Sequence, residues 1–248
     1  MGVVLPTSMS ASLTRAVFLD KTAQARVLPL DELGSVAVEQ LRPVREFFAW
    51  QGQRSYQGEW WSSTTHGLLP FESLLEREAL TFYDFDQRTV GLSVQPFAFL
   101  WARAAAGPRH HVPDVFVRLN DGRGCLVDVR PAEHVARGRD QFDRSAAACA
   151  EIGWTYVIYT GLPEPLRSNL RFIAGFRADR FALHDDLVAR ILEACPPEGC
   201  GLCDILDEAA RMTCSTPRAL AGVYHMLWCG DLNTNLDAPL SATSRLVR

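Results

Sequence analysis

The chain has 248 residues, and its 48% hydrophobic and 22% charged content is typical of a folded protein with one large domain or two smaller ones. A net charge of -4, from 25 Lys plus Arg against 29 Asp plus Glu, argues against a histone-like or polybasic nucleic-acid binder. No apolar run reaches about 18 residues, and the N-terminus lacks a basic start before a long apolar core. We therefore expect no membrane span, no membrane partner and no secretory signal.

Seven cysteines, an odd number without an export signal, predict reduced thiols in a cytoplasm. Cys200 and Cys203 have a spacing that is common among zinc ligands, but Cys214 and His225 would have to complete such a site. We therefore expect ordinary thiols here rather than zinc.

Residues 1 to about 45 are predicted to form a loosely structured N-terminal arm, with a short strand over residues 16–19 and a helix near 31–41. Residues 46–66 are rich in aromatic side chains. We expect these to pack on a sheet rather than to stack on bases. They are Phe47, Phe48, Trp50, Tyr56, Trp60 and Trp61.

The following segments alternate between helical and strand patterns. Apolar spacing predicts a helix over residues 71–85, and residues 90–101 predict a strand with Pro96 at a bulge or edge. Residues 115–119 and 125–129 predict a largely buried hairpin around an Asn-Asp-Gly turn.

A helix over residues 133–152 and a strand over 155–160 complete the pattern. The order helix, strand, hairpin, helix, strand predicts a mixed α/β sheet with helices on its faces, in a domain spanning residues 46–180.

Residues 181–248 are predicted to form a small α+β domain of winged-helix type, with three short helices followed by a β wing. The helices are expected at 187–194, 202–212 and 217–228, and the wing within 232–240. Five Arg against nine Asp plus Glu occur in residues 184–248. Because a DNA-reading domain should be locally basic, this one is better suited to binding a protein.

The segment HHVPDVFVRLNDGRGCLVDVRP, residues 110–131, contains an acid on each strand of the predicted hairpin. Pro113-Asp114 followed by Asp128 and Arg130 has the pattern of a PD-(D/E)xK nuclease site with arginine in the last position. Phosphodiester hydrolysis needs Mg²⁺ held by a few carboxylates, and a hairpin can bring two of them together. A buried Asp is also costly unless it is ligated or paired.

The length of the turn decides whether these residues meet. A turn over residues 120–124 would place Asp114 opposite Arg130, so that both project from the same side as Asp128. A two-residue turn would place Asp114 opposite Val129, on the wrong face.

A third carboxylate is expected on the preceding helix, where the candidates are Glu72, Glu76 and Glu78. Glu72 and Glu76 share a face because they are one helical turn apart, whereas Glu78 lies on another side.

Three segments resemble the TnsA family, the endonuclease subunit of heteromeric cut-and-paste transposases. They are LLEREALTFYDFDQRTVGLSVQPF (74–97), VPDVFVRL (112–119) and LVDVRPAE (126–133). The resemblance implies a restriction-endonuclease-like fold with Glu76, Asp114, Asp128 and Arg130 as catalytic residues. It also implies that Mg²⁺, or Mn²⁺ in its place, is held by the three carboxylates and the backbone carbonyl of Val129.

The family has lysine where this chain has Arg130, and the only lysine here is Lys21. A lysine can lose its proton and act as a base, but an arginine stays protonated. We therefore expect the metal to activate the attacking water, and Arg130 to bind the scissile phosphate and stabilise the transition state.

The resemblance further implies a subunit that cuts the 5′ ends of a transposon while a DDE-type transposase cuts the 3′ ends. A regulatory ATPase would be another partner, and the site of action would be the nucleoid in a bacterial cytoplasm. Two alternatives stay open: a catalytically impaired assembly or regulatory subunit, and a restriction or repair nuclease that works alone.

Four residues outside the catalytic set are candidates for contact with DNA, namely His111, Arg118, Arg167 and Arg171. A solvated helix face explains the two later arginines equally well. Gln95 occupies a position characteristic of the family, and we expect it to bond strand ends.

Overall fold

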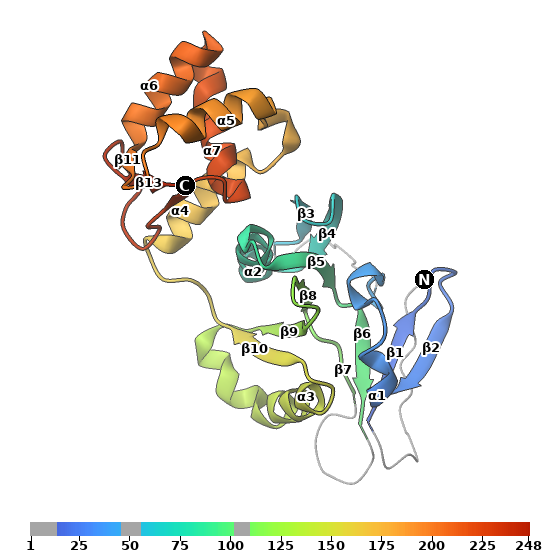
Figure 1. The fold of residues 1–248 in the computed structure, drawn as a ribbon. Helices are drawn as coiled ribbons and strands as arrows, with labels where there is room; N and C mark the ends of the chain where they lie inside the picture. The colour runs from blue at the N-terminus through green and yellow to red at the C-terminus, as the bar shows by residue number, and fades with distance from the viewer. Residues whose placement is uncertain (1–13, 46–55, 102–109) are drawn as a thin grey trace. The chain divides into compact units, whose positions relative to one another are not determined.

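The computed structural model describes three stretches of the chain, namely residues 14–45, 56–101 and 110–248. Figure 1 shows them as a mixed α/β protein with several small sheets. The aromatic residues Phe47, Phe48 and Trp50 lie outside the described residues. No helix in the described stretches is long and apolar enough to cross a membrane.

The chain divides into two compact units, Met1–Gly161 and Leu162–Arg248. The boundary predicted from the sequence lies near residue 180 instead. The difference is the segment containing α4 (Leu166–Ile173), which packs with the second unit. Asn169 of α4 holds it there, because its side chain donates to two backbone carbonyls near the C-terminus, those of Leu236 and Ala238.

A mixed four-stranded sheet of order β10-β9-β8-β5 carries the motif residues. Its strands are β5 (Thr89–Val94), β8 (Val115–Leu119), β9 (Gly124–Val129) and β10 (Thr155–Tyr159). Strand β9 pairs antiparallel with β8 and parallel with β10, and it is buried along its whole length. The predicted hairpin and the predicted strand after it are both confirmed.

Helices α2 (Leu74–Phe85) and α3 (Arg139–Glu151) lie on opposite sides of this sheet (Figure 1). The alternation of side chains along β10 shows the two faces. The Tyr159 hydroxyl donates to Glu78 of α2, whereas Tyr156 contacts Ser145 of α3.

Residues 14–45, expected to be a loose arm, contribute to a second sheet of order β2-β1-β6-β7. Its strands are β1 (Arg15–Leu19), β2 (Ala25–Pro29), β6 (Phe97–Leu100) and β7 (His110–His111). Ala16 and Leu33 are fully buried and belong to the same core cluster as Phe97, Phe116 and Leu126. This segment is therefore part of the core of the first unit.

Three predicted elements are interrupted in the structure. The helix expected near 31–41 is α1 (Leu30–Leu33) followed by a separate 3₁₀ turn, because Gly34 and Ser35 favour its termination. The strand expected over 90–101 is broken between β5 and β6, where Pro96 offers no N–H to a ladder. The helix expected over 133–152 begins only at Arg139, after a 3₁₀ segment.

A hairpin of β3 (Gly58–Ser62) and β4 (Gly67–Phe71) is tied to α2 through the buried carboxylate of Asp84. Its donors include Trp60 Nε1 at 2.9 Å, Ser62 Oγ at 2.8 Å and the Thr64 N–H at 2.9 Å. These bonds attach the hairpin to the C-terminal part of α2.

The second unit contains α4, three further helices and a small sheet of order β11-β13-β12. The helices are α5 (Asp185–Ala194), α6 (Leu202–Thr213) and α7 (Thr216–Cys229), and the strands are β11 (Cys200–Gly201), β12 (Asn233–Thr234) and β13 (Arg245–Val247). The three helices were predicted within a few residues of these bounds. The expected wing over 232–240 starts at β12, but its second strand lies later, at β13.

Candidate active site

The turn between β8 and β9 is shorter than the five-residue turn and longer than the two-residue turn that were considered from the sequence. Val117 pairs with Cys125, and the Leu119 N–H donates to the Arg123 carbonyl, so the loop contains only residues 120–122. Gly122 closes it with a φ of 86°, a conformation that favours glycine.

Both registers considered from the sequence are therefore wrong. Continuing the observed pairing places Asp114 beside Asp128 rather than opposite Arg130 or Val129. Because the shift from the predicted five-residue turn is an even number of residues, Asp114, Asp128 and Arg130 keep the same face of the pleat.

Asp114 lies immediately before β8, and its side chain is 7% exposed. Its Oδ2 accepts hydrogen bonds from the Val129 N–H at 2.7 Å and from NH1 of Arg130 at 3.1 Å. Burial raises the pKa of Asp114 to about 7; the charges of Asp128 and Glu76 add to this rise, and Arg130 opposes it. Two further carboxylates and one guanidinium thus act on Asp114.

Arg130 follows β9 and contacts two oxygens with one nitrogen. NH1 lies 2.6 Å from the Val129 carbonyl oxygen and 3.1 Å from Asp114 Oδ2. The side chain is 34% exposed, so the guanidinium is anchored inward but open to solvent.

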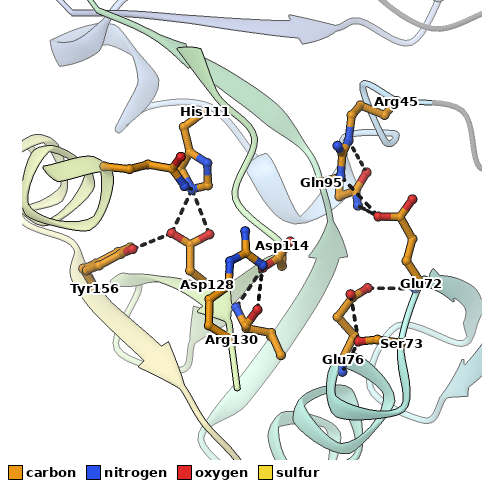
Figure 2. A network of polar contacts seen from close by, with 12 residues as sticks. Arg45, Glu72, Ser73, Glu76, Gln95, His111, Asp114, Asp128, Arg130 and Tyr156 are labelled. Carbon is orange, nitrogen blue, oxygen red and sulfur yellow. Dashed lines mark hydrogen bonds and ion pairs between the residues drawn. The ribbon is translucent and has the colours of Figure 1, made fainter. Parts of the chain in front are cut away.

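Asp128 is fully buried, and its carboxylate is directed to His111 and Tyr156 rather than to Arg130 (Figure 2). Both of its carboxylate oxygens lie 2.8 Å from Nε2 of His111, and the Tyr156 hydroxyl donates to Oδ2. Burial and then the Asp128 charge raise the pKa of Tyr156, so its hydroxyl keeps its proton and acts as donor. Partners on β7 and β10 therefore satisfy this carboxylate.

Glu76 projects from the first turn of α2 toward the space beside Arg130 (Figure 2). Its carboxylate accepts from the Glu72 N–H at 2.8 Å and from Ser73 Oγ at 2.9 Å, while Ser73 Oγ caps the helix by accepting from the Glu76 N–H. Burial raises the pKa of Glu76, although the two hydrogen bonds and the Arg130 charge oppose the rise.

The other two helix candidates have different neighbours. Glu78 accepts from the Tyr159 hydroxyl at 3.0 Å. Glu72 accepts from Arg45 and Gln95, each at 3.2 Å, and its backbone N–H is the donor to Glu76. Of the three, Glu76 has the charge that acts on Asp114.

Gln95 bonds strand ends, as expected. Its N–H donates to the Asp114 carbonyl at 3.0 Å, and its carbonyl accepts from the Val44 N–H at 2.9 Å. The residue is buried and has a φ of 45°, which is uncommon outside glycine and persists only where surrounding contacts hold it. Gln95 therefore positions the backbone that carries Asp114.

The oxygen atoms of this site are suited to a hard cation, but several of them already bond other groups of the protein. Carboxylate and carbonyl oxygens are the ligands that Mg²⁺ and Mn²⁺ prefer. In the described part of the chain, no group of three or more His, Cys, Asp or Glu side chains is arranged to hold a metal ion. A cation would require Asp128 to turn from His111, and Arg130 to leave Asp114.

Of the residues expected to contact DNA, two are engaged within the protein. His111 is 5% exposed and bonds Asp128. Arg118 bonds Glu39 and the carbonyls of Val36 and Gly122. Both therefore act as internal positioning residues in this structure.

The two later arginines, Arg167 and Arg171, lie on α4 in the second unit and are exposed. Arg167 forms a surface ion pair with Glu164 at 3.7 Å. They therefore belong to a different unit from the motif residues Glu76, Asp114, Asp128 and Arg130.

The cysteines of the second unit have varied neighbours. Cys195 and Cys200 place their sulfurs 3.6 Å apart, whereas Cys203 contacts Asp204 and Cys214 contacts the Arg211 carbonyl. His225 bonds the Phe176 carbonyl through Nδ1 and contacts the Cys229 thiol through Nε2, rather than joining Cys200, Cys203 and Cys214.

The sequence matches no protein-family model and no curated protein.

The site contains three residues that were not assigned from the sequence: Ser73, Tyr156 and, in its role as a partner of Asp128, His111. Ser73 had a usable signal, because Ser followed three residues later by Glu is a helix-capping pattern. Tyr156 had none, because its contact depends on the pairing of two distant strands.

Proposed function

We propose that this chain is a metal-dependent DNA endonuclease subunit of a transposase, similar to the TnsA family, which cuts the 5′ ends of a transposon. The observation that carries the proposal is the buried Asp114, whose pKa is raised first by burial and further by the charges of Asp128 and Glu76, two carboxylates from separate elements. Perturbed carboxylates gathered in this way are typical of catalytic sites. Residues far apart in the sequence contribute to one cluster, as the proposed chemistry requires.

Within this proposal the first unit has a restriction-endonuclease-like core and the second a winged-helix-like fold. Support for the first comes from the mixed sheet with a helix on each face. Support for the second comes from the order α5, β11, α6, α7, β12, β13, in which three helices precede a small hairpin.

Glu76, Asp114, Asp128 and the carbonyl of Val129 would hold Mg²⁺ or Mn²⁺, which when bound polarises the scissile phosphate and activates water. Arg130 remains protonated and can donate two parallel hydrogen bonds to a phosphate. Its 34% exposure leaves it accessible to a DNA backbone. His111 and Tyr156 would control how Asp128 is presented.

The proposed partners are the transposon ends, a DDE-type transposase that cuts the 3′ ends, and a regulatory ATPase, in the nucleoid of a bacterial cytoplasm. The C-terminal region carries a surplus of acidic residues, which suits contact with a protein more than with DNA. A near-neutral nuclease unit would then depend on the transposase to hold the DNA.

A nicking assay on supercoiled plasmid tests the proposal, with Mg²⁺ or Mn²⁺ and with or without a cognate DDE-type transposase. Asp114→Ala should reduce cleavage by at least about 100-fold, because it removes a metal ligand. Asp143→Ala is the matched control, since Asp143 is an exposed aspartate with only a weak surface ion pair to Arg139. Equal cleavage by Asp114→Ala and the unchanged protein would overturn the assignment, and full activity without a partner would favour a nuclease that works alone.

One observation favours a second candidate, a catalytically impaired assembly subunit. Arg130 occupies Asp114 Oδ2 and the Val129 carbonyl, the oxygens that a metal would need. Under this alternative the protein would bind its transposase partner but no divalent cation. Metal affinity measured with duplex DNA present therefore separates the two candidates.

A further inference from the structure

The side chain of Arg130 has an unusual position for a residue that would act on substrate. A single nitrogen, NH1, lies 2.6 Å from the Val129 carbonyl oxygen and 3.1 Å from Asp114 Oδ2. These atoms are a backbone carbonyl and a carboxylate oxygen, a pair that hard divalent cations also use. Figure 2 shows the guanidinium directed at Asp114 rather than outward.

The charge of Arg130 acts on more than this one carboxylate. Its electrostatic effect reaches both Asp114, which immediately precedes β8, and Glu76 of α2. An arginine stays charged under all ordinary conditions, so this positive charge cannot be removed by loss of a proton. A lysine in the same position would be a compact charge that can be neutralised.

We propose that Arg130 is a built-in competitor of the divalent cation, and that a DNA phosphate relieves the competition by drawing the guanidinium outward. This inference rests on the proposed function and concerns the regulation of the same site. Two cations cannot share the same two oxygens, because at such separations their repulsion is strong even after screening. The cation therefore binds well only after NH1 has left.

A phosphate is the group that can hold the guanidinium once it leaves. Guanidinium and phosphate form paired, charge-assisted hydrogen bonds. The side chain of Arg130 is 34% exposed while that of Asp114 is 7% exposed, so the arginine can move outward while the carboxylate stays buried. DNA and cation would consequently bind with positive coupling, and the site would bind cation poorly until DNA arrives.

The test is binding of Mn²⁺ to the full chain, measured by electron paramagnetic resonance of free Mn²⁺ and by calorimetry, without DNA. Arg130→Met keeps much of the side-chain volume and removes the charge, and it should bind Mn²⁺ about tenfold tighter or more than the unchanged protein. Arg130→Lys retains a positive charge and should bind Mn²⁺ more weakly than Arg130→Met. Asp114→Asn in the Arg130→Met background should abolish the gain.

A second arm repeats the titration with duplex DNA present. The unchanged protein should then approach the Mn²⁺ affinity of Arg130→Met, whereas DNA should change the affinity of Arg130→Met much less. Asp114→Asn with the same DNA corrects for Mn²⁺ bound by the DNA itself. Thermal unfolding of each variant, compared with Asp143→Asn, establishes that the proteins are folded.

The outcomes separate this inference from the function on which it rests. Equal Mn²⁺ affinity in the unchanged protein and Arg130→Met overturns the competition but leaves the metal-dependent nuclease standing. Absence of any Mn²⁺ site that depends on Asp114, in both proteins and with DNA, overturns both proposals. Tighter binding by Arg130→Met that is lost with Asp114→Asn supports the competition.

Discussion

At the scale of single residues, Asp114 and Asp128 meet the cost of burying a carboxylate in different ways. Asp114 accepts from a backbone N–H and a guanidinium, whereas Asp128 accepts from a histidine and a tyrosine. Charge-assisted hydrogen bonds of these kinds are among the stronger ones in proteins. For Asp114 they do not outweigh desolvation and two neighbouring acids, and its pKa is raised to about 7.

This raised pKa predicts how stability depends on pH in the metal-free protein. Between about pH 4 and about pH 7 the folded state keeps a proton on Asp114 that the unfolded state has released. The stability that Asp114 contributes below its unfolded pKa is therefore lost as pH rises through about 7. Asp114→Asn should remove this loss, which we expect to be about 1–4 kcal/mol.

The measurement is urea unfolding in a chelating buffer at several values from about pH 4 to about pH 8. Carboxylates far from Asp114 contribute equally to both proteins, so the difference between Asp114→Asn and the unchanged protein reports on Asp114 and the acids coupled to it. A difference that is constant over this range would contradict the raised pKa.

At the scale of elements, α2 connects the site to the β3–β4 hairpin. Its first turn carries Glu76 and the Ser73 cap, and its last turns carry Asp84, whose carboxylate holds Trp60 and the turn after β3. The helix is thereby fixed at both ends. Its position determines where Glu76 lies relative to Asp114.

Asp84→Ala should destabilise the first unit by about 3 kcal/mol, because it leaves several buried donors without their acceptor. Urea unfolding followed by tryptophan fluorescence measures the loss and also reports on Trp60. The exposed Asp143→Ala should stay within about 0.5 kcal/mol of the unchanged protein. A similar effect of both substitutions would show that the hairpin does not depend on Asp84.

Element types were more predictable than element ends. Strands β8, β9 and β10 follow the apolar and β-branched runs, and helices α5 to α7 follow helical apolar spacing. The position of a break depends on which distant backbone groups pair with the chain at that point. At the break before Pro96, for example, the backbone of Gln95 bonds both Val44 and Asp114. Strand β2 lies on an edge and is largely exposed, so the apolar pattern did not reveal it.

At the scale of the whole molecule, the chain consists of two units that each have a buried core. In the second unit, α5, α6 and α7 contribute fully buried side chains to one core, and β13 adds another. These include Ile191, Ile205, Val223 and Leu246. Such a core is what independent folding requires.

We expect residues 162–248 to fold when expressed alone, with a free energy of unfolding of about 5 kcal/mol. Far-ultraviolet circular dichroism during thermal unfolding should give a single cooperative transition. A gradual, non-cooperative loss of helix would contradict an independent unit. Because residues 162–248 contain nine Arg against eleven Asp plus Glu and so have no positive surplus, the isolated unit should also bind duplex DNA only weakly at moderate salt.

The α/β class, the buried hairpin and the four motif residues of the candidate site could be predicted from the sequence, because periodicity, turn residues and the spacing of acids are local properties. The tertiary structure decided which groups those residues contact. It set the register that places Asp114 beside Asp128, turned Asp128 toward His111 and Tyr156, and put Arg130 on the Val129 carbonyl. Such contacts depend on how strands distant in the sequence pair and on which polar groups lie next to buried charges. No single segment of the sequence specifies these properties.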